Sequence, residues 1–296
     1  MNSSIEVIYG FDSLVKMRYK NLIMEPELPA IYKRHYPFRL ACPSFIYPAG
    51  YVDNVRKLCG IVDEIELLLL ESAPADLPRA DDIRELSSLA ADNHLTFNVH
   101  LPTDIPLAAG QAGAADPAVE AVLRAVDLSR PLAPVSYTLH VPLTESPAHG
   151  GGAPPGWQAR VRKSLERLLT ASGLPAEAIA VETLDYPLDY LAPVIREMGL
   201  SVCLDTGHLM VREESCRACF KTWQDRIVII HTHGVAQGRD HLPLDRLSAA
   251  QSLEIADILT GFRQSVSLEI FSLPALAASL IYLDTLWHHS SQLKND

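Results

Sequence analysis

The chain has 296 residues, of which 48% are hydrophobic and 21% are charged, so it can build a packed core and is not a disordered or fibrous chain. Its 25 Lys and Arg residues against 36 Asp and Glu residues give a net charge of −11, which argues against a general nucleic-acid-binding protein. No apolar run approaches the roughly 18 residues of a membrane-spanning helix, and the first residues lack signal-peptide features. We therefore expect a cytoplasmic protein with no nucleic-acid or membrane partner.

The first 36 residues differ in pattern from the rest. Residues 5–36 mix charged and apolar residues without strand character, which predicts a short helical N-terminal extension (1–36) before a single domain over residues 37–296. This extension would either cap the domain or meet a second subunit, so an oligomer is an open alternative. The five cysteines, an odd number in a chain of this size, are expected to be reduced thiols. The lone Cys216-x-x-Cys219 pair is interpreted as two helix-face thiols rather than a zinc or redox site.

Short β-rich segments alternate with segments of helical periodicity from residue 38 onward. The expected strands are 38–42, 63–70, 95–101, 135–141, 179–184, 200–204, 226–231 and 265–270. The expected helices include 79–92, 117–128, 157–171, 188–198 and 249–262. Such alternation is typical of parallel βαβ units, and eight units in about 260 residues favour an α/β fold of the (β/α)8 barrel (TIM barrel) type.

Two of the connections that follow strands are unusually long. Residues 102–116 follow the third expected strand and residues 142–156 follow the fourth. Both leave the carboxyl ends of their strands, where barrel enzymes build their active sites, so they are lid candidates, with plain surface insertions as the alternative. Neither segment contains Lys or Arg.

Six consecutive expected strands end in ionisable residues that are flanked by apolar or small ones. These residues are His100, His140, Glu182, Asp205, His233 and Glu269. Because strand side chains alternate between faces, the ionisable groups are expected to point into the barrel while their neighbours pack on the helices. Several carboxylates in one low-dielectric pocket repel one another unless cations lie between them. Imidazole and carboxylate ligands suit Zn, Mn, Fe or Co, so the pattern predicts a divalent metal site.

With these residues in place, the sequence resembles the xylose-isomerase-like barrels, which include endonuclease IV and the ketose 3-epimerases, over residues 38–273. The resemblance implies that one shared metal is held by Glu182, Asp205, His233 and Glu269. The Asp-x-x-His of the sixth strand in that family is matched by Asp205 and His208. Arg239, six residues after His233, matches a substrate-contacting Arg of the epimerases.

The endonuclease branch of the family has two further histidines, on strands three and four. They are matched by His100 and His140, which implies a second metal sharing Glu182, so two divalent ions are expected. A third site in that branch uses an Asp-x-His after strand seven, whereas Asp240 and His241 are adjacent here, which argues against a third metal. His231 is interpreted either as a pocket residue or as a buried structural histidine.

A narrower resemblance lies near the beginning of the expected barrel. The stretch Arg39-Leu-Ala-Cys-Pro-Ser-Phe-Ile-Tyr-Pro-Ala49 and the run Glu64-Ile-Glu-Leu-Leu-Leu-Leu-Glu-Ser72 look like the cobamide-remodelling phosphodiesterases, bacterial barrels that cut the nucleotide loop of corrinoids. The resemblance implies a small-molecule corrinoid substrate and no organic cofactor besides it. It also implies hydrolysis by a metal-activated water that attacks phosphorus.

The two resemblances together imply catalytic and substrate-binding roles for particular residues. The implied catalytic residues are Glu182, His208, Arg239 and Glu269. The implied substrate contacts are His208, Arg239, Phe45 and Tyr47, with Tyr51 and Trp157 as further candidates for an aromatic mouth and ordinary packing as the alternative for each ring. Glu66 is interpreted as either a carboxylate supporting the metals or a surface group, because Glu64 and Glu66 share a face and one of them could be solvated.

Three other functions compete with the phosphodiesterase hypothesis. A sugar isomerase or epimerase would need one metal and would not need His100 and His140. An abasic-site endonuclease would use the same metals but would need basic loops facing DNA. A corrinoid carrier would need an Asp-x-His-x-x-Gly loop, and Asp205-x-x-His208 has a different spacing.

Overall fold

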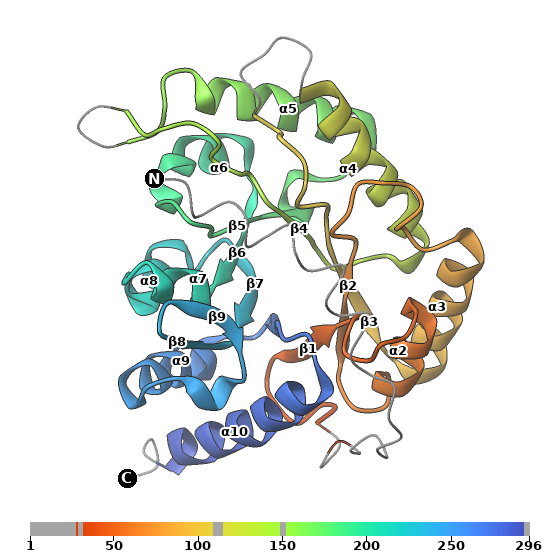
Figure 1. Cartoon of the computed structure of the whole chain (residues 1–296), viewed down its shortest axis with the longest axis vertical. Helices are drawn as coiled ribbons and strands as arrows, with labels where there is room; N and C mark the ends of the chain where they lie inside the picture. The colour runs from red at the N-terminus through yellow and green to blue at the C-terminus, as the bar shows by residue number, and fades with distance from the viewer. Residues whose placement is uncertain (1–27, 29–31, 109–114, 149–151, 293–296) are drawn as a thin grey trace.

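The computed structural model describes residue 28 and residues 32–108, 115–148 and 152–292. Eight parallel strands form a closed barrel in the order β1-β10-β7-β6-β5-β4-β3-β2, and the helices form a ring around it (Figure 1). The strands of the barrel are β1 (Arg39–Pro43), β2 (Glu64–Leu68), β3 (Thr96–His100), β4 (Tyr137–Leu139), β5 (Ile179–Glu182), β6 (Ser201–Asp205), β7 (Ile227–Thr232) and β10 (Ser265–Leu268). The predicted (β/α)8 barrel is thereby confirmed.

The helices pack their apolar residues against the outer face of the barrel. They are α2 (Tyr51–Leu58), α3 (Ala80–Asn93), α4 (Ala115–Ser129), α5 (Trp157–Ser172), α6 (Ala192–Met198), α7 (Thr206–Val211), α8 (Cys216–Trp223), α9 (Ala249–Gly261) and α10 (Leu273–Gln292). Short 3₁₀ turns lie at η1 (Arg130–Leu132), η2 (Ala176–Ala178), η3 (Leu188–Tyr190) and η4 (Leu244–Arg246). No helix in the described part of the chain is long and apolar enough to cross a membrane.

Two expectations about local structure are modified by the observed chain. The expected helix over residues 188–198 divides into η3 and α6, because Pro193 occupies the first turn of α6 and proline has no backbone N–H to continue a preceding helix. Most of the expected N-terminal helix lies outside the described residues, and residues 32–36 within it form a turn rather than a helix. The Cys216-x-x-Cys219 pair lies on α8, and all five cysteines are free thiols.

A small hairpin that the sequence pattern did not predict follows β7. Its strands are β8 (Gly234–Ala236) and β9 (Arg239–Leu242), which pair antiparallel. Gly234 is needed at its base, because a Cβ there would collide with the carbonyl oxygen of Pro243. The hairpin turns the chain back over the carboxyl end of the barrel and so brings Asp240 and His241 to the ends of the strands.

Candidate metal centre

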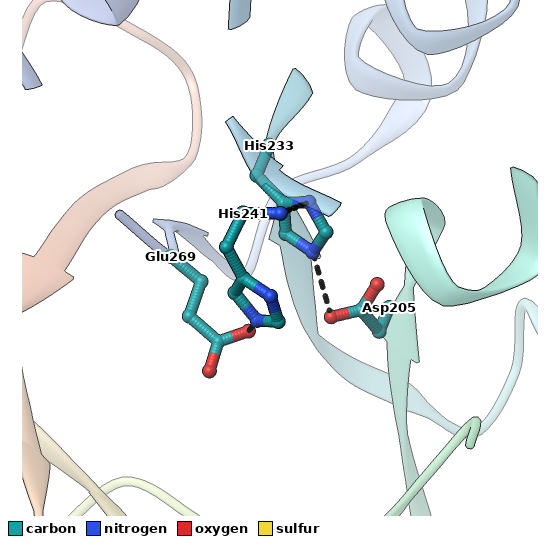
Figure 2. Close-up of side chains that lie close together, drawn as sticks. All are labelled: Asp205, His233, His241 and Glu269. Atoms are coloured by element: carbon teal, nitrogen blue, oxygen red, sulfur yellow. Dashed lines mark hydrogen bonds and ion pairs between the residues drawn. The ribbon is translucent and has the colours of Figure 1, made fainter. Parts of the chain in front are cut away.

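Four side chains meet at the carboxyl end of the barrel, and we call them the four-residue cluster: Asp205, His233, His241 and Glu269 (Figure 2). Asp205 ends β6, His233 follows β7, Glu269 follows β10 and His241 lies on β9. Their nearest ligand atoms all lie within 4.8 Å of one another. His233 Nε2 is 3.2 Å from Asp205 Oδ2, and His241 Nε2 is 3.3 Å from Glu269 Oε2.

A second set of ligand atoms, the three-residue cluster, consists of His100, His140 and Glu182. His100 ends β3, His140 directly follows β4 and Glu182 ends β5. Glu182 Oε2 lies 3.2 Å from His100 Nε2 and 2.9 Å from His140 Nε2. Glu182 and His100 are almost fully buried, whereas the side chain of His140 is 19% exposed, so this cluster is reached from the side of His140.

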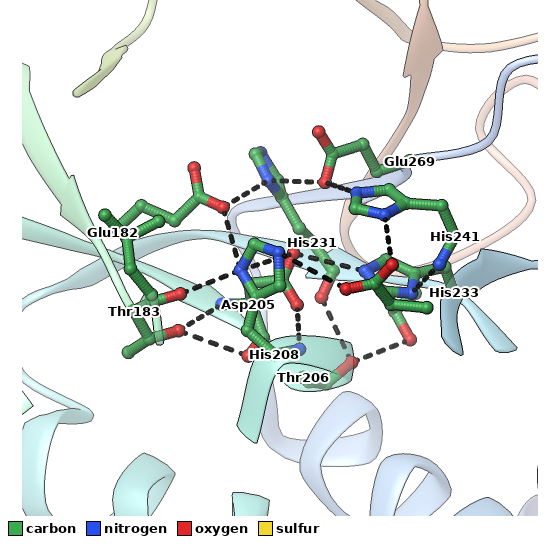
Figure 3. A network of polar contacts seen from close by, with 12 residues as sticks. Glu182, Thr183, Asp205, Thr206, His208, His231, His233, His241 and Glu269 are labelled. Carbon is green, nitrogen blue, oxygen red and sulfur yellow. Dashed lines mark hydrogen bonds and ion pairs between the residues drawn. The ribbon is translucent and has the colours of Figure 1, made fainter. Parts of the chain in front are cut away.

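His208, on the first turn of α7, lies between Glu182 of the three-residue cluster and Asp205 of the four-residue cluster (Figure 3). Its Nδ1 is 2.9 Å from the carbonyl oxygen of Thr183, 3.4 Å from Glu182 Oε1 and 3.6 Å from Asp205 Oδ2. Asp205 also caps α7, since its Oδ1 accepts a hydrogen bond of 2.7 Å from the backbone N–H of His208. The cap fixes one oxygen of Asp205 and turns the other toward His233.

His231 and Glu66 lie beneath both clusters, inside the barrel. His231 Nε2 is 2.9 Å from Glu66 Oε1, while His231 Nδ1 is 3.2 Å from Glu269 Oε2 and 3.8 Å from Glu182 Oε1. Glu66 also accepts a hydrogen bond from Ser267. Glu66 is fully buried, which excludes the surface interpretation of this residue.

Glu64, which lies one inward position before Glu66 on β2, is fully buried as well, so the expectation that one of the two could be solvated is wrong. Its carboxylate accepts hydrogen bonds from Thr96 and Asn98 and pairs with Arg39 Nε at 3.0 Å. Glu64 therefore belongs to a separate polar layer nearer the amino ends of the strands.

The buried polar atoms at the carboxyl end fit divalent metal ions. Glu182 Oε1, Glu269 Oε2 and both ring nitrogens of His231 lie near charged groups but make no hydrogen bond of acceptable geometry. Buried polar atoms without hydrogen bonds are costly, and a bound cation would supply the missing partner for those that face a cluster. Imidazole nitrogens and carboxylate oxygens together are typical ligands of Zn, Mn, Fe and Co. The residues therefore suit such ions.

The carboxylates of the two clusters are held in their charged form by the histidines around them. Burial alone would raise the pKa of Glu182, but His140, His231 and His100 lower it well below the ordinary value. Burial likewise opposes ionisation of Glu269, and His231 and His241 lower its pKa well below the ordinary value. These carboxylates are therefore charged at neutral pH and are ready to act as ligands.

The carboxylates in turn raise the pKa of the partly exposed histidines His208 and His241. Burial lowers the pKa of His208, but Asp205 and Glu182 raise it to about 9. Burial also lowers the pKa of His241, and Glu269 and Asp240 raise it to about 11. A cation that binds among these residues therefore competes with protons for the same carboxylates.

The residues expected to line the mouth of the site differ in how exposed their side chains are. Phe45 is 48% exposed, and Arg239, on β9, is also exposed. Tyr47 lies in the core, with the ammonium of Lys57 4.2 Å from its ring centre. Trp157 is completely enclosed in the core, so of its two alternatives the structure supports ordinary packing and excludes a place in the mouth.

Tyr51 lies between these extremes. Its side chain is partly buried, and its hydroxyl donates hydrogen bonds to the carbonyl oxygens of Leu68 and Asp76. Tyr51 therefore ties the start of α2 to the segment that follows β2.

The sequence pattern relates Asp240 and His241 only to a third metal site, which it disfavours, and it does not predict the place of His241 in the four-residue cluster. Asp240 Oδ2 lies 3.9 Å from His208 Nε2. The hairpin instead points the far nitrogen of His241 at Glu269. The available signal was Gln237-Gly238, a turn sequence flanked by short extended segments.

The barrel and its two clusters define a (β/α)8 protein whose histidine and carboxylate ligands gather at the carboxyl ends of the strands. A protein-family model described as the xylose isomerase-like TIM barrel matches residues 53–285, most of the chain. The chain therefore belongs to the xylose isomerase-like TIM barrel family, whose members include sugar epimerases and endonuclease IV. No curated protein sequence matches this chain.

Solved structures with other sequences share the fold. A D-tagatose 3-epimerase-like protein is 15% identical with a TM-score of 0.68, covering 86% of this chain and 99% of that chain. An L-ribulose 3-epimerase is 17% identical with a TM-score of 0.66, covering 87% and 97%. Endonuclease IV from Thermus thermophilus is 16% identical with a TM-score of 0.61, covering 85% and 99%. At these identities the likeness concerns the fold alone.

Proposed function

We propose that this chain is a metal-dependent phosphodiesterase that hydrolyses the nucleotide loop of cobamides. The observation that carries the proposal is the presence of two adjacent ligand clusters rather than one. His231 Nδ1 lies within 3.8 Å of both Glu182 and Glu269, one residue from each cluster. A pair of metal sites suits phosphoryl transfer, in which the attacking and leaving oxygens both need charge stabilisation.

The two clusters would each hold one divalent ion in this proposal. When bound, such ions lower the pKa of a water molecule and neutralise the charge of a phosphoryl group. His208 Nδ1 donates to the Thr183 carbonyl, which leaves Nε2 as the ring atom that faces the accessible side. In the proposal, this nitrogen is the atom of His208 that contacts a phosphate oxygen of the substrate.

The substrate part of the proposal rests on the resemblance of residues 39–72 to the cobamide-remodelling phosphodiesterases and on charge. Neither loop expected to flank the site, 102–116 or 142–156, contains Lys or Arg, which disfavours a polyanionic DNA substrate. A corrinoid carries one phosphodiester and a large apolar ring system. The exposed ring of Phe45 and the exposed guanidinium of Arg239 are the groups proposed to contact them.

A sugar epimerase is the second candidate, because a single metal in the four-residue cluster would be enough for that chemistry. The fold is shared with several sugar epimerases. This candidate leaves His100 and His140 without a metal-binding role, and it therefore predicts that their replacement does not change activity.

The test is incubation of the metal-loaded protein with adenosylated and cyanated cobamides under reducing, anaerobic conditions. Products are followed by absorbance and mass spectrometry. We expect a corrinoid that lacks its lower nucleotide, and its mass identifies the ester bond that is cut. An intact cobamide in the presence of confirmed metal would overturn the proposal, and conversion of ketose sugars would then support the epimerase.

Variants sharpen this test. Glu182→Gln is expected to lower the rate by at least about 100-fold, since loss of a ligand exceeds the 10–100-fold effect of an outer hydrogen-bonding partner. Glu177→Gln is the matched control, because Glu177 is exposed in η2, the turn before the amino end of β5, and belongs to neither cluster. Full activity of Glu182→Gln would rule out the proposed metal chemistry.

A further inference from the structure

We propose that His241 is the fourth metal ligand of the four-residue cluster, so that this cluster is a closed anchoring site while the three-residue cluster is the open, reactive one. The inference rests on the proposed two-metal function and assigns different tasks to its two sites. The family pattern that the sequence matches uses Glu182 together with Asp205, His233 and Glu269 for the shared metal. In this chain a nitrogen of His241 also lies among the ligand atoms of Asp205, His233 and Glu269.

The orientation of His241 is fixed by contacts on both faces and at one nitrogen. Its Nδ1 lies 3.0 Å from Asp240 Oδ1 and its Nε2 points toward Glu269 at 3.3 Å, so a metal-bound His241 would keep the proton on Nδ1 and present Nε2 to the ion. Carboxylate–histidine pairs of this kind orient histidine ligands of metals. The ring also stacks on His233, with centroids 4.2 Å apart and an interplanar angle of 16°, and on Phe271 at 5.2 Å.

The backbone of His241 is itself unusual. Its φ angle is +50°, a left-handed conformation that residues with a Cβ rarely adopt. The backbone N–H of His241 donates a hydrogen bond of 2.9 Å to Nδ1 of His233. The hairpin thus holds in the left-handed conformation a residue whose main chain and side chain both contact the cluster.

The division of tasks follows from the number of protein donors. Four protein donors are typical of metal sites that hold an ion in place, and three are typical of sites that leave a position for substrate or solvent. His100, His140 and Glu182 provide three, and the partly exposed His140 lies toward the opening. His208 is not counted as a fourth donor here, because the nitrogen nearest Glu182, Nδ1, is engaged by the Thr183 carbonyl, and Nε2 lies toward Asp240, 3.9 Å from its Oδ2.

Zinc affinity, measured by competition with a chromogenic chelator on the full chain, tests the proposal. The wild type is expected to release one zinc ion at low chelator concentration and a second at a concentration at least about 10-fold higher. In His241→Gln the tightly held ion is lost at low chelator concentration, whereas in Glu182→Gln only the weakly held ion is affected. Asp240→Asn is expected to weaken the tight site by about 10–100-fold, as loss of an outer partner of a histidine ligand does.

His94→Gln is the matched control. His94 is exposed, lies far from the site at the end of α3, and has a φ of +49°, so the same substitution acts on the same backbone conformation. If His241→Gln fails to fold, Asp240→Asn decides by the same measurement. Unchanged release of both ions in either variant would overturn the assignment. The readout needs no substrate, so a protein that releases zinc as expected but leaves cobamides intact would refute the proposed function and not this inference.

Discussion

The carboxylate of Glu66 lies 2.9 Å from Nε2 of His231, and both side chains are fully buried on the barrel axis. The other nitrogen of His231 faces Glu269 and Glu182, one residue from each ligand cluster. Glu66 therefore fixes the ring that lies against both metal-binding carboxylates. A buried charge pair of this kind is costly to break, since the remaining partner stays out of water.

Glu66→Gln is expected to destabilise the protein by about 3 kcal/mol, because it removes one charge of a buried pair. It is also expected to weaken zinc binding by about 10-fold or more, because His231 no longer holds Glu182 and Glu269 in place. Chemical denaturation measures the first effect and chelator competition the second.

Glu64→Gln is the control for this prediction. Glu64 is on the same strand, is equally buried, and pairs with Arg39 at a layer away from the clusters. Its replacement should lower stability without changing zinc affinity. Equal zinc affinities for wild type and Glu66→Gln would show that Glu66 acts on stability only.

The sequence permits much of this arrangement to be predicted because parallel strands place their carboxyl ends together. Any histidine or carboxylate at a strand end therefore reaches the same site, as His100, Glu182 and Asp205 do. His241 could not be assigned in this way, since it lies on β9, whose path is decided by tertiary packing at Gly234 and Pro243. The sequence also left the place of Trp157 open, because an aromatic residue at a helix start suits a mouth and a core equally well, and the structure places it in the core.

Asp205 caps α7 and also supplies an oxygen to the four-residue cluster, and substitutions can separate these two roles. Asp205→Asn retains an oxygen that can accept the hydrogen bond from the backbone N–H of His208, whereas Asp205→Ala removes it. Both variants should lose the ion of the four-residue cluster, and the alanine variant should be less stable than the asparagine variant by about 1 kcal/mol. Thermal unfolding of the metal-free proteins and zinc titration measure the two effects.

Ser215→Ala provides the comparison for a helix cap away from the clusters, together with the hydrogen bond that Ser215 Oγ donates to Glu254. Ser215 caps α8 by accepting a hydrogen bond from the backbone N–H of Ala218, and it is not a ligand of either cluster. Its loss should cost about 1 kcal/mol and leave zinc binding unchanged. Asp205→Asn with the zinc affinity of the wild type would remove Asp205 from the ligand set.

Gly207 allows the metal site to be disturbed without replacing any ligand. A Cβ at this position would overlap the imidazole ring of His233, which packs directly on the backbone of α7. Gly207→Ala must therefore displace the ring from the four-residue cluster. We expect the free energy of unfolding to fall by about 1–3 kcal/mol because of overpacking, together with loss of the tightly held zinc ion.

Gly261→Ala is the control. A Cβ at Gly261, at the end of α9, meets no atom within 4 Å, so this substitution should be neutral or stabilising by about 0.4–1 kcal/mol with zinc binding intact. If Gly207→Ala binds zinc as the wild type does, the position of the His233 ring does not determine metal binding, and the ligand set requires revision.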